Sequence, residues 1–298
     1  MRKSRFFTYR TSNMEYSPDD IAAAANLQLL SYIYTSMTTF WIYDYACSLH
    51  EEWKFLLRSR WSQVKALYVI TRYLPFVLIT MYLCLNFTPN ANPNKCRSLI
   101  NIYSSFCQIS IICSGSFFVL RTYALWNNNR TVLAGMLSAV FAITVASVSI
   151  RFITISTSYV TTSAIPGIPG CYWSSSGVQF FMPFILLFVF QLVLISLTLT
   201  RVIQSWRSVK GHLHAILVTH NISYYACGLL LSAVNVLIPV LFSDSACYSV
   251  LEDFQVLILA ILSTRMHLHL WHIDRDVHGS DALVCISMSN MSPADHMA

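Results

Sequence analysis

Two charged residues, Asp44 and Arg72, stand inside long apolar stretches of this chain, which makes them its strongest candidates for chemistry. A charge inside a membrane span costs several kcal/mol unless it is paired or hydrated, so it usually marks function or a structural pair. Asp44 lies about one turn from the end of its stretch, and the flexible Arg72 side chain can reach toward it from the next helix. We therefore predict an intramembrane ion pair that clamps two helices. The alternative is that Asp44 lies in interfacial water beside His50 and Glu51.

Motifs for catalysis or metal binding find little support in the sequence. It has no Gly-rich phosphate loop, no nucleophile elbow and no paired carboxylates inside the apolar stretches, so an enzyme is the least supported class and no cofactor is expected. His267, His269 and His272 cluster near the last apolar stretch. Helical residues share a face when they are three or four apart, so His267 and His269 point to nearly opposite sides. This spacing argues against a metal site.

A small-molecule site is expected in the outer half of the helical bundle, between the third, fifth, sixth and seventh spans. Such a site needs an apolar cavity with a few convergent polar groups, and its ligand would be small and hydrophobic. The alternative is that the candidate residues pack against each other, with Tyr and Phe forming an interfacial belt. The candidates are Tyr103, Gln108, Phe180, Gln191, Asn235 and Gln255.

Seven stretches of roughly 20 or more mostly apolar residues hold these side chains, and each is long enough to cross a hydrocarbon core about 30 Å thick as a helix. Composition agrees, because 55% of the residues are hydrophobic and 11% are charged, against roughly 25% charged in soluble domains. We predict an all-α integral membrane bundle of seven transmembrane helices. A polar tail (1–20) precedes this domain (21–272), and a disordered cytoplasmic tail (273–298) follows it. The spans are expected near residues 24–47, 64–86, 99–121, 132–151, 177–200, 213–240 and 249–270.

Lysine and arginine gather in the joints after the first, third and fifth spans, and short cytoplasmic joints accumulate these residues. The N-terminus is therefore predicted outside and the C-terminus in the cytoplasm. Arg121 and Arg265 would then close the third and seventh spans at their inner ends, where a long side chain reaches the interface. A six-span arrangement with the first segment lying on the membrane is the alternative. The residues that count against the predicted orientation are Arg2, Lys3, Arg5 and Arg10.

Cysteine placement predicts one disulfide, because disulfides form on the outer or lumenal side of a membrane and rarely in the cytosol. Cys96 stands just before the third span and Cys171 lies in the Ser/Thr-rich outer loop after the fourth, so a bond between them would fasten this loop to a helix top. Two free thiols are the alternative, and Cys247 can compete for the bond. Asn86 begins a glycosylation sequon in an outer position, but it lies so near the bilayer that its modification stays open.

Several motifs resemble a known family. The first four lie between residues 43 and 75: Tyr43-Asp44-Tyr45, Glu51-Glu52-Trp53, Trp61 with Lys65, and Arg72-Tyr73-Leu74-Pro75. These blocks resemble the N-terminal signature of a fungal membrane family of unknown function, domain-of-unknown-function family 6533. Downstream blocks are similar as well, although Trp126 and His269 depart from the pattern; these blocks are Leu120 to Leu125, Cys171-Tyr172-Trp173 and Ser263-Thr264-Arg265-Met266. The resemblance implies a multi-span helical protein of fungal membranes, and it implies no biochemical activity.

An odd number of spans, an outer loop fastened over the helix tops and short basic inner joints suit a receptor-like sensor that binds a small ligand outside and shifts its helices inside. A small-molecule or ion transporter is one alternative, although the internally repeated halves typical of transporters are not evident. A structural membrane subunit is the other. The net charge is +6, but the basic residues gather at the ends of the spans, where they orient a membrane protein. No nucleic-acid partner is therefore expected. The expected partner is the lipid bilayer; a cytoplasmic partner and the membrane of residence are not specified.

Overall fold

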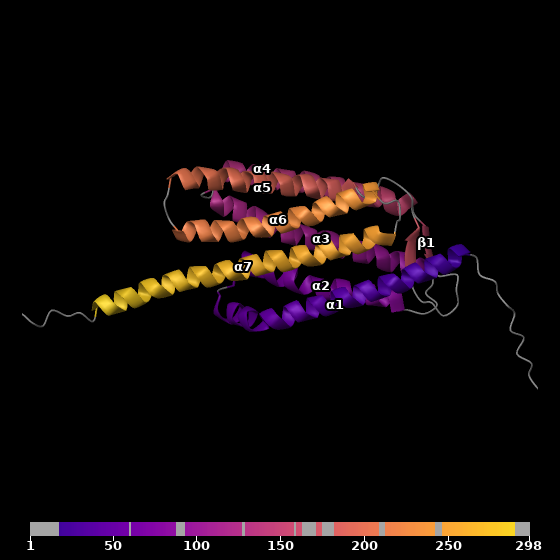
Figure 1. The fold of residues 1–298 in the computed structure, drawn as a ribbon, viewed down its shortest axis with the longest axis horizontal. Coiled ribbons are helices and arrows are strands. Elements are labelled where there is room, and N and C mark those ends of the chain that lie inside the picture. The colour runs from indigo at the N-terminus through magenta and orange to yellow at the C-terminus, as the bar shows by residue number, and fades with distance from the viewer. Residues whose placement is uncertain are drawn as a thin grey trace, which may run out of the picture.

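The computed structural model shows a bundle of seven long helices with a two-stranded hairpin between the fourth and fifth (Figure 1). It describes residues 18–59, 61–87, 93–126, 129–157, 159–162, 171–174, 182–208, 212–241 and 246–289. The elements are α1 (Pro18–Arg58), α2 (Gln63–Phe87), α3 (Pro93–Leu125), α4 (Arg130–Thr157), β1 (Tyr159–Thr162), β2 (Cys171–Ser174), α5 (Met182–Ser208), α6 (His212–Leu241) and α7 (Ala246–Ser289).

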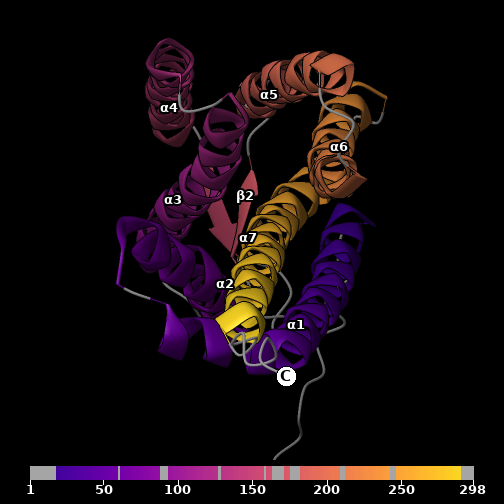
Figure 2. The same cartoon turned by 90° about the vertical axis from the view of Figure 1, so that its left-hand side faces the viewer.

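Helix α7 occupies the centre of the bundle. It packs against α1, α2, α3 and α6, and the end-on view shows it surrounded by other helices, with α4 at the periphery (Figure 2). Half of its most apolar window, 50%, is buried inside the protein, against 11% for α4. Polar residues on α7 are therefore positioned to meet partners from several helices at once.

Five of the described helices are long and apolar enough to cross a membrane. Helices α1 and α6 are not among these five, although α6 contains the apolar stretch Ile222–Ile238. The protein is thus a helical membrane protein with several spans, and the arrangement of exactly seven stays a prediction. The five candidate spans are Gln63–Leu85, Asn94–Leu125, Arg130–Thr154, Met182–Gln204 and Val250–Ile273.

Large apolar side chains cover the outer faces of the bundle. Phe141 and Phe152 on α4 are 72% and 75% exposed, and Leu230 on α6 is 65% exposed. Apolar surface of this extent is unfavourable in water, whereas lipid tails solvate it. The exposed apolar side chains therefore agree with a bundle surrounded by lipid.

The joint between α1 and α2 is closed by polar contacts that follow from its sequence. The Ser62 hydroxyl accepts a hydrogen bond from the Lys65 backbone N–H at 3.2 Å, which caps the start of α2. The Lys65 ammonium donates to the carbonyl oxygens of Leu56 and Ser59 at 2.7 and 2.9 Å. These carbonyls lack helical partners at the end of α1, and a cation there also interacts favourably with the helix dipole. Lys65 therefore ties the end of α1 to the start of α2.

Two features differ from the sequence-based expectation. The loop after α4 contains the antiparallel pair β1–β2, in which Thr162 pairs with Cys171. The two strands contain β-branched and aromatic residues, which favour strands. Helix α7 continues to Ser289, whereas the sequence predicts a disordered tail from residue 273. The last residues, 290–298, lie outside the described part of the chain, as does the polar N-terminal tail up to residue 17.

Opposite ends of the bundle carry the start of α1 and the end of α7, and the β-hairpin lies at the end where α1 starts (Figure 1). Reporter tags placed before residue 1 and after residue 298 are therefore expected on opposite faces of the membrane in intact cells. The basic inner joints predict that the N-terminal tag is the outer one. Protease protection of each tag, before and after permeabilisation, measures this. Finding both tags on one face would contradict the arrangement.

Candidate functional site: a buried ion network

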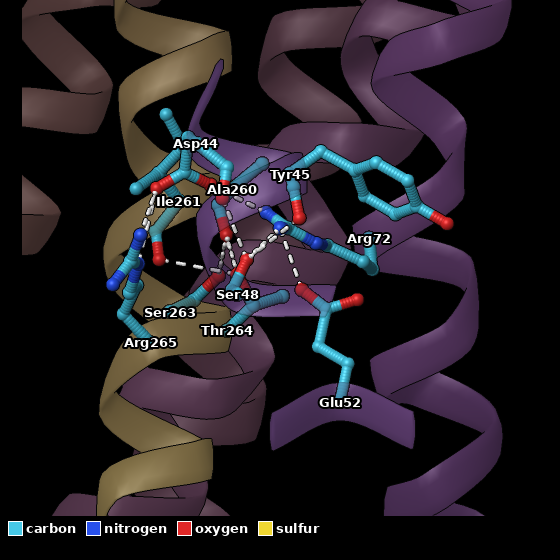
Figure 3. A network of polar contacts seen from close by, with 10 residues as sticks. All are labelled: Asp44, Tyr45, Ser48, Glu52, Arg72, Ala260, Ile261, Ser263, Thr264 and Arg265. Atoms are coloured by element: carbon cyan, nitrogen blue, oxygen red, sulfur yellow. Dashed lines mark hydrogen bonds and ion pairs between the residues drawn. The ribbon is translucent and has the colours of Figure 1, made fainter. Parts of the chain in front are cut away.

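Three polar residues of α1 share the helix face that meets α2. Asp44, Ser48 and Glu52 follow one another at intervals of four, so their side chains stack along one side of the helix. The Arg72 guanidinium of α2 reaches all three: Nη1 lies 2.8 Å from Asp44 Oδ2, and Nη2 lies 2.5 Å from both Ser48 Oγ and Glu52 Oε1 (Figure 3). The structure thus brings Asp44 and Arg72 together as the sequence predicts, and adds Ser48 and Glu52.

The central helix adds a second arginine to this network. Arg265 of α7 donates from Nε and Nη2 to Asp44 Oδ1 at 3.0 and 2.7 Å (Figure 3). Asp44 therefore accepts from one arginine on each of its two oxygens and joins α1, α2 and α7. Two carboxylates face two guanidinium groups, so the formal charges of the network cancel. This cancellation satisfies the requirement that buried charges be paired.

Aromatic rings cover the buried guanidinium. The Cζ atom of Arg72 lies 5.1 Å from the Trp41 ring centroid and 5.4 Å from that of Tyr45. Both separations are within the range of favourable cation–π interactions. Trp41 is 0% exposed and also packs edge-on against Phe76, with 5.8 Å between the ring centroids. Because Arg72 is only 1% exposed, ring faces, carboxylates and a hydroxyl replace its water.

The segment that builds this network is the one that comparison with known proteins picks out. Residues 32–77 match the model of a family of unknown function, DUF6533. The DUF6533 segment spans most of α1, the joint and the first half of α2, and it contains Trp41, Asp44, Ser48, Glu52 and Arg72. No curated protein and no solved structure matches the chain.

The DUF6533 segment forms a pair of helices that is fastened by its own residues. Its two helical arms are joined by the Arg72 contacts and by the Lys65 contacts at the joint. Arg265 is the network member that the rest of the chain supplies. The chemistry that these contacts supply is the electrostatic fastening of helices.

A second polar site lies nearer the hairpin end of the same helices. The Tyr34 hydroxyl of α1 donates a short hydrogen bond to Asp253 Oδ2 of α7. A cavity of about 20 Å³ adjoins this contact and is lined mainly by aromatic and apolar side chains, including Tyr82 and Tyr103. Arg151 of α4 donates hydrogen bonds to Ser104 and to Glu252, the residue before Asp253.

The predicted ligand residues that the structure describes lie in more than one environment. Gln255 of α7 bonds Asn235 and Ser232 of α6, and Ser232 Oγ in turn donates to Gln191 Oε1 of α5 at 2.7 Å. Gln191, Asn235 and Gln255 thus belong to one hydrogen-bonded cluster, which corresponds to the alternative in which these residues pack together. Tyr103 lines the separate cavity beside Asp253. Gln108 is half-buried on α3, and Phe180 lies outside the described residues.

The other predicted residues are placed as follows. Cys96 is 2% exposed and is not one of the five described cysteines with free thiols; the side chain of Cys171 lies outside the described residues, so the bond between them stays a prediction. Arg121 is partly buried, and its Nη2 atom lies 3.1 Å from His267 Nδ1 of α7; its place at an inner helix end stays a prediction. Among the described residues, no group of three His, Cys, Asp or Glu side chains is placed to hold a metal ion.

Proposed function

We propose that the protein is a receptor-like sensor, in which a ligand at the hairpin end moves α7 relative to α1. The observation that supports this is a pair of polar contacts between the same two helices at different heights. Tyr34 meets Asp253 near the hairpin end, and Asp44 meets Arg265 deeper in the bundle. Ten residues separate the two positions on α1 and twelve separate those on α7, which corresponds to about 15 to 18 Å along each helix.

A displacement of α7 at one contact is transmitted to the other, because a packed helix behaves as a nearly rigid rod over this length. A shift of α7 by 1–2 Å at a helix interface is of the size seen in switching proteins. A displacement that alters the Tyr34–Asp253 contact therefore also changes the geometry between Asp44 and Arg265. The same helix pair thus connects the cavity to the ion network.

The Arg265 contact is the more easily broken part of the network. Its side chain is 42% exposed, whereas that of Arg72 is 1% exposed. Ion pairs with solvent access contribute only about 0–1 kcal/mol, so Arg265 separates from Asp44 at little cost. Arg72 remains bonded to Asp44, Ser48 and Glu52 when this happens. In the proposed mechanism, Arg265 separates from Asp44 and frees α7, while Arg72 keeps helices α1 and α2 together.

Amide hydrogen exchange on the purified full-length protein in nanodiscs tests this coupling without requiring a ligand. Tyr34→Phe removes the hydroxyl that donates to Asp253, and the matched control Tyr225→Phe removes a buried tyrosine hydroxyl that bonds Thr122 and the Phe118 carbonyl. We expect Tyr34→Phe to accelerate exchange around residues 262–272 by about three- to tenfold, a loss of about 0.7 to 1.4 kcal/mol of local stability. Tyr225→Phe is expected to leave this segment unchanged.

Two other results would replace the proposal. Unchanged exchange near Arg265 in Tyr34→Phe would show that the two contacts are independent, as in a structural subunit. Saturable accumulation of a solute inside sealed proteoliposomes would identify a carrier. The exchange measurement and the uptake measurement are independent, so each alternative is recognised by its own signal.

A further inference from the structure

Asp253 is a buried carboxylate that forms no ion pair within the described part of the chain. It is 7% exposed, and the uncharged hydroxyls of Tyr34 and Tyr103 hydrogen-bond its carboxylate. The nearby cation Arg151 forms its ion pair with Glu252 instead. Asp44 and Glu52, by contrast, each contact an arginine. An ionisable group placed like Asp253 inside a membrane bundle often serves as the counter-ion of a ligand.

The walls of the adjoining cavity indicate which kind of cation fits. Tyr34, Tyr82 and Tyr103 present aromatic rings, and Leu78 and Val256 are apolar. Aromatic rings attract organic ammonium groups through cation–π interactions. A divalent metal ion requires six or more oxygen ligands, which one carboxylate and a few hydroxyls do not supply. These walls therefore favour an organic cation over a metal ion.

The size of the cavity narrows the choice further. Its volume of about 20 Å³ is close to that needed for one water molecule. A primary ammonium group is similar in size to water and donates up to three hydrogen bonds, of which the Asp253 carboxylate can accept one or two beside the one from Tyr34. Quaternary ammonium groups carry methyl groups that exceed this volume.

We propose that the cavity between α1, α2, α3 and α7 binds the primary ammonium group of an amine, with Asp253 as its counter-ion and the three tyrosines as its aromatic walls. This inference deepens the proposed function, because it names the ligand class for the helix contact that the sensor would use. The amine is either a free small molecule or the headgroup of phosphatidylethanolamine. Both carry the same ammonium chemistry.

Binding of phenethylammonium to the full-length protein in phosphatidylglycerol nanodiscs, measured by titration calorimetry, tests the site. Its uncharged counterpart, 2-phenylethanol, has a hydroxyl in place of the ammonium group. We expect saturable binding of phenethylammonium and at least about tenfold weaker binding of 2-phenylethanol, because hydrogen bonds to charged groups contribute this much. Equal affinity for the two compounds would overturn the proposal.

Three variants test where phenethylammonium binds. Asp253→Asn removes the counter-ion and is expected to weaken phenethylammonium binding at least about tenfold. The control Glu51→Gln removes an acidic charge at the other end of the bundle and should not alter the affinity, because the Glu51 side chain is 40% exposed there. Thr38→Leu places a larger side chain at a half-buried position of the cavity wall and keeps Asp253. It should block binding even if Asp253→Asn is poorly folded. Wild-type affinity in both Asp253→Asn and Thr38→Leu would refute the site.

Lipid composition then separates the two sources of the amine. A lower apparent affinity for phenethylammonium in nanodiscs that contain phosphatidylethanolamine would show that the headgroup occupies the cavity. Unchanged affinity assigns the cavity to a free amine, and either result supports the ammonium site. Binding without a change in amide exchange near Arg265 would retain this site and reject the sensor.

Discussion

Replacing Arg72 by methionine is expected to destabilise the protein more than any other change in the ion network. The substitution leaves Asp44 and Glu52 buried, at 6% and 2% exposure, without the guanidinium that bonds both. Removing one partner of a buried ion pair typically costs about 3–5 kcal/mol, because an uncompensated charge remains. The apparent melting temperature and the yield of monodisperse detergent-solubilised protein measure this loss. We expect both to fall sharply in the single variant.

A combined variant isolates the electrostatic cause. Adding Asp44→Asn and Glu52→Gln to Arg72→Met removes both carboxylates that lose the Arg72 guanidinium and retains their approximate shapes. Stability should therefore recover substantially, since a neutral buried site of similar volume is often as stable as an ion pair. An Arg72→Met variant within about 1 kcal/mol of the wild type would show that the network contributes little.

The second large effect is expected for Trp41→Ala. Trp41 is 0% exposed and contacts both Phe76 and the Arg72 guanidinium. Its removal therefore leaves a cavity and takes away the ring that covers the guanidinium. Large-to-small changes of this type cost about 3–5 kcal/mol. Thermal unfolding in detergent, followed by intrinsic fluorescence or by size-exclusion after heating, measures the change.

The adjacent aromatic residue provides the matched control. Phe40 lies on the same helix but is 48% exposed and faces outward. Phe40→Ala should therefore change stability by less than about 1 kcal/mol. Similar losses in Trp41→Ala and Phe40→Ala would mean that general helix hydrophobicity, and not packing around Arg72, sets the stability of α1.

The sequence predicts the Asp44–Arg72 contact because a charge in an apolar span needs a partner, and the two residues lie on consecutive helices. The sequence analysis does not assign Glu52 to this contact, although its spacing of four from Ser48 and eight from Asp44 puts it on the same face. For Arg265, the sequence predicts a position at an inner helix end. Its contact with Asp44 depends on how α7 sits beside α1, and helices far apart in the chain carry no local signal for that arrangement.

The predicted ligand residues show a related limit. Gln191, Asn235 and Gln255 meet in one hydrogen-bonded cluster. Helix rotation was not predictable, because a helix that is apolar on every side in lipid lacks the amphipathic stripe that orients helices in water. Tyr103 instead lines the cavity beside Asp253, and the sequence does not predict the pairing of Tyr34 with Asp253.

The Lys65 closure of the first helical joint has a consequence for how the chain enters a membrane. Lys65 fastens the end of α1 to α2, and Arg72 of α2 contacts the buried acids Asp44 and Glu52 of α1. These contacts join segments that are synthesised long before α7, so both acids already have a cation available when α1 and α2 leave the insertion machinery. The two helices together partition into lipid at lower cost than α1 alone, in which Asp44 and Glu52 lack Arg72. The two helices are thus suited to insert together, with α7 docking onto a hairpin that is already in the bilayer.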